Sequence, residues 1–309
     1  MSDIVEDFPE AGGPGGSFGW VPDPEEVERI VRIQPFAEFA ETPAWQTEAP
    51  LPAQVFLWEL ARKYTGGLLP PANQGKVGSC VAFGTARAIQ YTTLGEMSRG
   101  DPDPPVPLVE EAIYGTSRID IGKGRLGRAD GSTGAWAAEA VRILGLLKRG
   151  WTGGIDLSRY DPARCRNWGQ SGVPRIFKNT MRLHRVRGIC RVKTWEEAKR
   201  ALASGSAIAV CSRVGFVRVR DVDGFCARRG TWGHCMCLCG YQTGGREGGR
   251  LDNSWGTEAH TGPVGAGNPG PEGFWVDAEI LKEMLAEGDS WAFSAVEGFP
   301  DRGVVSWWI

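Results

Sequence analysis

Apolar residues recur at helical spacing through the first half of the chain and predict helices there. The clearest pattern covers residues 79–94, and Gly95 suits its C-terminal end. A charged stretch at 23–31 opens with Asp-Pro and predicts a further short helix. Two more helical patterns cover residues 108–117 and 134–147. We therefore expect the first half to be rich in helix.

Strand patterns dominate the second half, after a stretch rich in glycine and proline that predicts loops from about residue 157. One helix interrupts the strands, because Thr194 is a good N-cap, Glu197 completes a capping box and Gly205 follows the last turn. The expected strands cover residues 186–192, 207–211, 231–239, 250–253 and 273–276. This order indicates an α+β fold with a helical lobe, a β-rich lobe and a cleft between them.

The domain boundaries follow from these changes in pattern. We expect residues 1–65 to form an N-terminal arm and an accessory segment, with autoinhibition as one role for it. Residues 66–185 are expected to form the helical lobe and residues 186–309 the β-rich lobe.

Charge and hydropathy argue against several classes of partner. The 35 Lys and Arg against 37 Asp and Glu give a net charge of −2, which offers no electrostatic reason to bind nucleic acid or an anionic membrane. The first 20 residues are acidic and Gly-rich, so we expect no secretory signal. No stretch approaches the roughly 18 apolar residues of a membrane helix. These features predict a soluble, unexported protein.

The chain has eight cysteines, too scattered to act as staples in 309 residues, and we expect most of them to be reduced and buried. Cys235, Cys237 and Cys239 alternate, which places them on one face of a strand. Their C-x-C-x-C spacing has no second ligand pair at zinc-site distance, which favours core packing over metal binding. We therefore expect no metal and no cofactor.

Cys80 opens the helix expected at 79–94, and Gln74 lies six residues before it. The partly positive first turn of a helix stabilises a thiolate, which is the reactive form of a cysteine nucleophile. If the intervening loop folds back, the Gln74 amide and the Cys80 backbone N–H converge as two donors for a tetrahedral oxyanion. The stretch therefore predicts acyl-transfer chemistry at Cys80.

Only three histidines are candidates for the base. His184 lies among basic residues and His260 in a Gly- and Pro-rich loop, and we expect both to be surface residues. His234 begins an apolar strand and is followed by Asn253 and Trp255. An asparagine on a neighbouring strand can accept the imidazole N–H, and a tryptophan can shield that hydrogen bond from water. His234 is therefore the predicted base and Asn253 its orienting residue.

These residues resemble, in the same order, the motifs of the papain family of cysteine peptidases. The matching motifs are Gln-Gly-x-x-Gly-Ser-Cys-x-Ala-Phe, Gly-His-x-x-x-x-x-Gly-Tyr, Asn-Ser-Trp-Gly and a late Gly-Phe-Trp. His234 follows Cys80 by 154 residues (234 − 80), close to the family's usual spacing. The resemblance implies that Cys80 is the nucleophile, His234 the acid/base, Asn253 the orienting residue, Gln74 an oxyanion donor and Trp255 the shield.

The resemblance covers about residues 66–298, and the chain departs from the family pattern within it. Val77 stands where the family has a disulfide-forming cysteine, which fits a reducing compartment, and Val81 replaces an aromatic residue beside the thiol. A second tryptophan after Asn-Ser-Trp-Gly and a helical propeptide signature upstream are also missing. The long Gly/Pro loops are similar in style to bacterial and bacteriophage members, so we expect a cytoplasmic or virion-associated protein.

The resemblance also places the substrate cleft. The family's paired glycines on the cleft wall correspond to Gly131 and Ser132, and the residue before the histidine is Gly233. We expect these three residues and Trp255 to bind substrate.

The sequence thus favours a papain-like thiol peptidase that cleaves peptide or protein substrates through a Cys80 acyl-enzyme. Two alternatives stay open. A catalytically silent or plugged component of an assembly such as a phage virion, with partner proteins around it, would keep the fold without the activity. An amidase or cell-wall hydrolase would use the same Cys/His pair on another bond.

Overall fold

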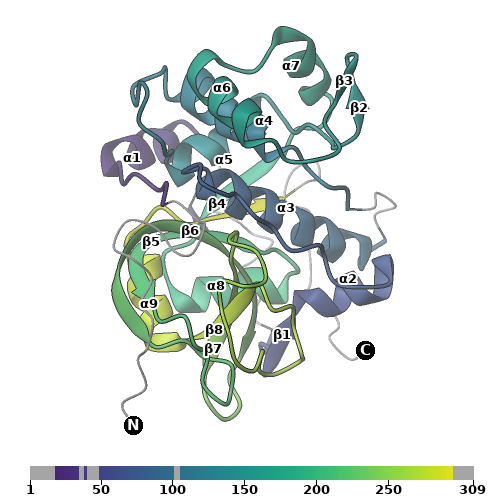
Figure 1. The fold of residues 1–309 in the computed structure, drawn as a ribbon. Coiled ribbons are helices and arrows are strands. Elements are labelled where there is room, and N and C mark those ends of the chain that lie inside the picture. Colours follow the sequence, from purple (N-terminus) through teal and green to yellow (C-terminus); the bar gives the residue numbers. More distant parts are fainter. Residues whose placement is uncertain (1–17, 35–37, 40–48, 101–104, 295–309) are drawn as a thin grey trace.

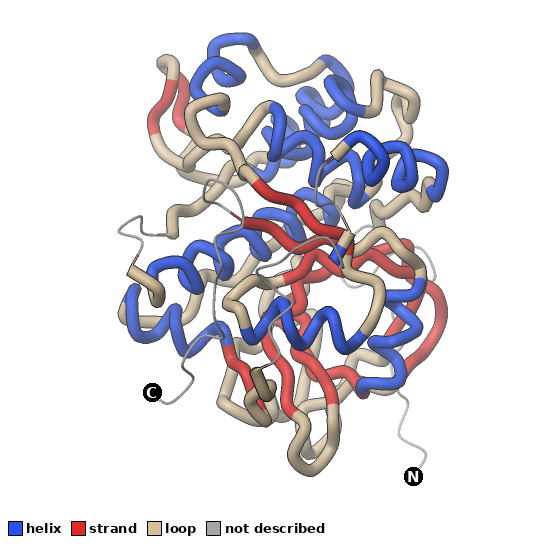
Figure 2. Tube along the Cα trace, turned by 180° about the vertical axis from the view of Figure 1, so that it is seen from behind, coloured by secondary structure: helices blue, strands red, loops and turns tan. Residues whose placement is uncertain are grey.

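The computed structural model describes residues 18–34, 38–39, 49–100 and 105–294. One layer is a curved antiparallel sheet of seven strands in the order β4-β9-β5-β6-β7-β8, with β1 paired to β6. Helix α3 lies across this layer, α4 to α7 lie beyond it, and α8 and α9 pack against the strands (Figures 1 and 2). The expected α+β fold with a helical and a β-rich lobe is confirmed.

The helices are α1 (Pro24–Ile33), α2 (Leu57–Thr65), α3 (Cys80–Met97), α4 (Glu110–Gly115), a π-helical turn (Thr116–Ile121), α5 (Gly134–Ile143), α6 (Pro162–Ser171), α7 (Arg175–Met181), α8 (Trp195–Ala203) and α9 (Ala278–Ala286). The strands are β1 (Gln54–Phe56), β4 (Gly188–Arg191), β5 (Ile208–Phe216), β6 (Arg228–Gln242), β7 (Gly248–Asp252), β8 (Gly273–Asp277) and β9 (Trp291–Ser294). A separate hairpin joins β2 (Trp151–Thr152) and β3 (Ile155–Asp156).

Helix α3 is buried along almost its whole length, and two glycines let it lie close to strand β6 and to the turn before β5. A Cβ atom on Gly84 would lie 2.8 Å from Cys235 Sγ, and one on Gly95 would lie 2.1 Å from the carbonyl oxygen of Gly205. The helix runs on to Met97, so the prediction that Gly95 ends it is wrong. The missing side chain at Gly95 serves close packing instead of termination.

The expectation of loops in the middle of the chain is wrong for 162–181, where α6 and α7 form. Pro162 occupies the first turn of α6, where a helix tolerates proline, and Asp161 caps it by accepting the N–H of Ala163 at 2.8 Å. Gly172 ends the helix with φ of 87°. Pro162 and Gly172, which predict loops in the sequence, thus mark the start and the end of α6.

The capping box expected before α8 is confirmed. Glu197 N–H donates to Thr194 Oγ1 at 3.2 Å, and Glu197 Oε2 accepts the Thr194 N–H at 3.1 Å. The five expected strands appear as β4 to β8. The pairing of β6 with β7 brings two candidate site residues together, because His234 lies on β6 and Asn253 directly follows β7.

Parts of the region assigned to the N-terminal arm pack onto both lobes. Helix α1 buries Val27 and Ile30, and Gln34 Nε2 at its end donates to Glu139 on α5 at 3.0 Å. Residues 49–65 contribute β1 to the large sheet and α2, which packs on α3.

Within the described ranges, no helix is long and apolar enough to cross a membrane. The same residues contain no group of three or more His, Cys, Asp or Glu side chains able to hold a metal ion. All eight cysteines are buried and unpaired, as expected.

Candidate active site

Cys80 lies at the first position of α3 and is fully buried. Ser79 before it makes no side-chain cap bond, so the helix start keeps N–H groups available for an anion. Burial raises the pKa of the Cys80 thiol well above its usual value, and the backbone N–H groups of Cys235, Gly19 and Val81 lower that pKa by less. The sulfur therefore has donors for a thiolate, but burial keeps it protonated.

His234 on β6 is oriented by the residue that follows β7. Its Nε2 lies 2.9 Å from Asn253 Oδ1, and the centroid of its ring lies 4.4 Å from that of the buried Trp255. Its Nδ1 is buried and has no hydrogen-bond partner among the described residues. The amide fixes the ring through one nitrogen and leaves the other for proton transfer.

Gln74 is fully buried before α3, and its side-chain amide is fixed at both ends. Gln74 Nε2 donates to the carbonyl oxygen of Val77 at 2.8 Å, and Oε1 accepts the hydroxyl of Ser254 at 2.6 Å. The Gln74 backbone N–H also donates to the Ser254 carbonyl at 2.8 Å. Gln74 is therefore tied to the segment that carries Asn253.

Residues 18–21, which we call the covering segment, pass through this site. The N–H groups of Gly19 and of the tryptophan after it both donate to the carbonyl oxygen of Gly233, at 2.9 and 2.8 Å. Ser132 N–H donates to the Gly19 carbonyl at 2.8 Å, and the Ser132 carbonyl accepts the N–H of Val21 at 2.9 Å. The segment is held on two sides by backbone hydrogen bonds.

Glycine is required where the covering segment meets its walls. A Cβ atom on Gly19 would lie 2.0 Å from the carbonyl oxygen of Gly78, which leaves no room for any side chain in this arrangement. Gly131 has φ of 113°, and a Cβ atom there would lie 2.8 Å from Val21 Cγ2. The fit depends on bare backbone at both positions.

The aromatic ring of Phe18 covers the histidine. Its centroid lies 5.8 Å from that of Trp255, 6.0 Å from that of Trp232 and 6.3 Å from that of His234. The sequence reasoning missed Trp232, although it stands two positions before His234 on the same strand and so on the same face.

Trp20 anchors the covering segment to a buried carboxylate. Trp20 Nε1 donates to Asp289 Oδ2 at 2.8 Å, and Asp289 also accepts the N–H groups of Gly134 and Ala135 at the start of α5, each at 2.7 Å. Burial raises the pKa of Asp289 to about 6, against the lowering effect of these donors. The carboxylate joins the covering segment to a helix N-terminus, where a negative charge is favourable.

The residues expected from the sequence thus meet in one place. They are Gln74, Cys80, Gly131, Ser132, Gly233, His234, Asn253 and Trp255. Gly131, Ser132, Gly233 and Trp255 contact the covering segment, as do Cys80 and His234, and Gln74 and Asn253 are buried beside them.

Cys80 and His234 are both neutral in this covered arrangement. Burial lowers the pKa of His234 to about 4, and the hydrogen bond to Asn253 raises it by less. Because burial also raises the pKa of Cys80, neither side chain is charged near pH 7.

His260 is a site residue that sequence reasoning missed, and the prediction that it lies on the surface is wrong. It is 2% exposed, and its Nε2 lies 3.1 Å from Asn253 Nδ2. Burial lowers its pKa well below the usual value, and the guanidinium groups of Arg220 and Arg250 lower it further. A neutral His260 can accept the Asn253 N–H. Its loop has no periodic pattern that would have placed it here.

No family model matches the chain, and no curated protein matches it in sequence. Among solved structures, it is similar to xylellain, a cysteine protease from Xylella fastidiosa, at 16% identity over 96% of this chain and 100% of that chain, with a TM-score of 0.55. It is also similar to digestive procathepsin L 3 of the Tenebrio molitor larval midgut, at 15% identity over 87% and 79% of the two chains, with a TM-score of 0.53.

A further similar structure is the ragweed pollen cysteine protease Amb a 11 in its proform. The identity is 14% over 90% of this chain and 76% of that chain, with a TM-score of 0.52. The chain therefore has the fold of papain-like cysteine proteases. Identities at this level show the fold and leave the chemistry to be argued from this chain's own residues.

The low pKa of His234 predicts a pH-dependent stability. A group whose pKa falls on folding contributes stability that is present above its unfolded pKa, near 6.5, and is lost as the pH falls toward 4. A shift of this size corresponds to roughly 3 kcal/mol. We expect His234→Gln to lose less folding stability on acidification by about this amount.

Urea unfolding of both chains at pH 8, 6 and 4 measures this effect. The difference in free energy of unfolding between the two chains at pH 8 reports the change in packing. Any further change in this difference on acidification reports the titration of His234. Parallel pH profiles for the two chains would contradict the assignment.

Proposed function

We propose that the chain is a thiol peptidase in which Cys80 is the nucleophile and His234 the acid/base. The observation that carries the proposal is the 2.9 Å hydrogen bond between His234 Nε2 and Asn253 Oδ1. This bond leaves His234 Nδ1 without a hydrogen-bond partner among the described residues. The next residue on the strand is Cys235, and its backbone N–H meets the Cys80 sulfur. This is the arrangement that a base-activated thiol requires.

The proposed reaction begins once the covering segment leaves the site. Exposure lowers the pKa of Cys80 and raises that of His234, so the thiol proton passes to the imidazole. The thiolate attacks the scissile carbonyl carbon, and the carbonyl electron pair moves to oxygen. His234 then protonates the amine as the C–N bond breaks. Water, deprotonated by His234, hydrolyses the thioester and regenerates the thiolate.

Two donors are proposed for the oxyanion: the Cys80 backbone N–H at the start of α3 and the Gln74 amide. The hydroxyl of Ser254 supports this role, because it binds Gln74 Oε1 and so turns the amide nitrogen toward the helix start. Both donors are fixed before substrate arrives, so they need little reorganisation.

The covering segment supports two further proposals. It forms hydrogen bonds with the backbone of Ser132 and Gly233 and packs against Gly131 and Trp255. We propose that a peptide substrate binds to these same groups. We also propose that the segment is autoinhibitory, because Cys80 is fully buried and its sulfur meets the backbone N–H of Gly19 in this segment. Two of the similar structures are proteases in their pro-forms, which is consistent with this proposal.

His260 is proposed to position Asn253. By accepting from Nδ2 at 3.1 Å, it sets the amide so that Oδ1, and not the nitrogen, meets His234. Arg220 and Arg250 support this role, because they disfavour the imidazolium form, which could not accept that bond.

Gly19→Val is expected to open the site. The valine side chain would clash with the backbone at Gly78, and overpacking of this kind costs about 1 to 3 kcal/mol, so labelling of Cys80 by a peptidyl electrophile should rise roughly tenfold to hundredfold. Gly244→Ala is the matched control, because a Cβ atom there meets nothing within 4 Å. Equal labelling of both variants and the unaltered chain would disprove autoinhibition by this segment.

Cys80→Ala in the Gly19→Val chain is expected to abolish peptide hydrolysis and labelling together. Cys190→Ala, which removes another buried thiol on β4, should retain both. Undiminished turnover without Cys80 would refute the nucleophile assignment.

The same Gly19→Val chain separates the alternative functions. Hydrolysis of a peptidoglycan digest but not of a peptide library would show an amidase or cell-wall hydrolase. No labelling of an exposed Cys80 would favour a silent component of an assembly.

His260→Leu in the opened chain is expected to lower kcat roughly 10- to 100-fold, because Asn253 loses the acceptor that sets its amide. His260→Gln keeps an acceptor oxygen and should recover most of the rate. Circular dichroism melting of both variants checks that the fold is intact. Equal loss in the two variants, at equal stability, would show that His260 only fills space.

A further inference from the structure

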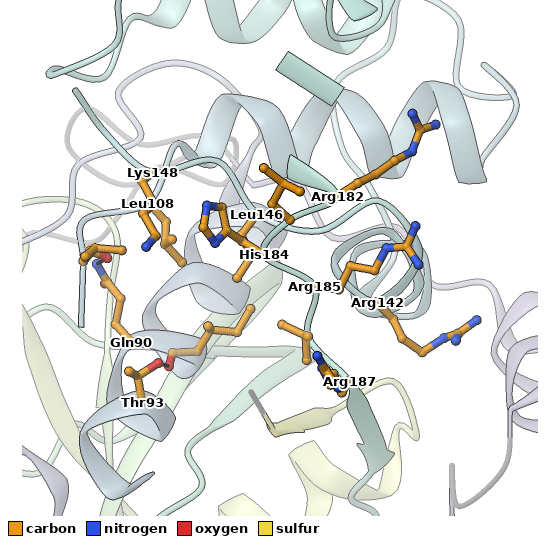
Figure 3. A pocket seen from close by; sticks show the side chains of 14 residues that line it. Gln90, Thr93, Leu108, Arg142, Leu146, Lys148, Arg182, His184, Arg185 and Arg187 are labelled. Carbon is orange, nitrogen blue, oxygen red and sulfur yellow. Dashed lines mark hydrogen bonds between the residues drawn. The ribbon is translucent and has the colours of Figure 1, made fainter. Parts of the chain in front are cut away.

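A cavity of about 690 Å³ lies between the C-terminal half of α3, the end of α5 and residues 182–187, which lead into β4 (Figure 3). Its nearest lining residue on α3 is Ile89, nine residues beyond Cys80. At a rise of 1.5 Å per residue, this places it about 14 Å along the helix from the thiol. The cavity is therefore separate from the candidate active site.

Most of the polar side chains in the lining are basic. Its basic side chains are Arg142, Lys148, Arg182, His184, Arg185 and Arg187, and among the described residues that line the cavity none is Asp or Glu. Arg142 pairs with Glu139 at 3.0 Å, whereas Lys148, Arg182 and Arg185 form no ion pair within the described residues. Figure 3 shows the Arg142, Arg182 and Arg185 side chains extending to one side of the cavity, with Lys148 on the other. Like charges gathered in this way repel one another until an anion binds.

Backbone contacts fix the wall that carries these cations. Leu146 N–H donates to the carbonyl oxygen of His184 at 3.0 Å, and Val186 N–H donates to that of Val141 at 3.1 Å. Gly145 has φ of 87°, and a Cβ atom there would lie 1.9 Å from the carbonyl oxygen of Met181. The cavity is therefore preformed, which lowers the entropic cost of binding.

The rest of the lining is apolar, and its apolar residues are Ile89, Val106, Leu108, Leu146, Leu183 and Val186. A volume near 690 Å³ suits a small molecule and not a polymer. The guanidinium group of arginine can form two parallel hydrogen bonds with the oxygens of one phosphate group. We propose that this cavity binds a small organic anion that joins a polyphosphate group to an apolar or aromatic body.

Calorimetry on the Cys80→Ala chain at low salt tests the proposal without any hydrolysis. The probes are ATP, which has both chemical parts, inorganic tripolyphosphate, which has the charge alone, and citrate, which has carboxylates instead. We expect one saturable site that binds ATP roughly tenfold tighter than tripolyphosphate, and citrate more weakly than either.

Arg182→Gln and Arg185→Gln are each expected to weaken ATP binding roughly tenfold, because each removes a charge-assisted contact. Arg128→Gln removes an exposed cation outside the cavity and should change nothing. Thr93→Trp fills the cavity at unchanged charge and should weaken ATP binding more than tripolyphosphate binding. Thermal melting verifies the fold of each variant.

Three results would overturn the proposal. The first is the absence of saturable ATP binding below the millimolar range. The second is an equal loss in Arg128→Gln and Arg182→Gln, which would show diffuse charge attraction. The third is citrate binding as tightly as the phosphates.

Discussion

The site depends on how closely α3 approaches the sheet. Gly84 presents bare backbone to Cys235 on β6, and Gly95 presents it to Gly205 just before β5, so any side chain at either glycine would push the helix outward. Because β6 carries His234 and the next strand leads to Asn253, this contact sets the thiol, the imidazole and the amide relative to one another. A helix held a few ångströms further out would keep every residue of the site and lose its geometry.

In the proposed function, the covering segment acts on chemistry as well as on access. Burial raises the pKa of Cys80 and lowers that of His234, and we propose that the covering segment contributes to this burial by excluding water. In this proposal the covered protein holds Cys80 and His234 both uncharged and therefore unreactive. Opening would supply space for a substrate and, through solvation, the thiolate–imidazolium pair itself. A single displacement would control both requirements.

Local signals foretold the parts of the fold that depend on neighbouring residues. The capping box at Thr194 and the apolar spacing after Ser79 are complete within one turn or one helix, so α8 and α3 could be predicted. Pro162 is ambiguous in the sequence because proline can start a helix or break one, and the Asp161 cap before it decides for a helix start.

For the candidate site, too, residues within local motifs could be predicted and residues placed by long-range contacts could not. Those in ordered motifs could be proposed from the sequence, whereas His260 could not, because only the folding of its loop onto Asn253 gives it a place. The covering segment could not be located either, since its contacts with Gly78 and Ser132 join distant parts of the chain. Such contacts leave no local period to detect.

The central claim is that the covering segment keeps a competent pair uncharged. With only three histidines in the chain, ¹⁵N NMR of the imidazole nitrogens measures it directly. At pH 7, His234 should give the signal of a neutral ring in the unaltered chain and that of an imidazolium in Gly19→Val. The imidazolium signal should vanish again when Cys80→Ala is added. A ring that stays neutral in the opened chain, or one already charged in the covered chain, would contradict the account.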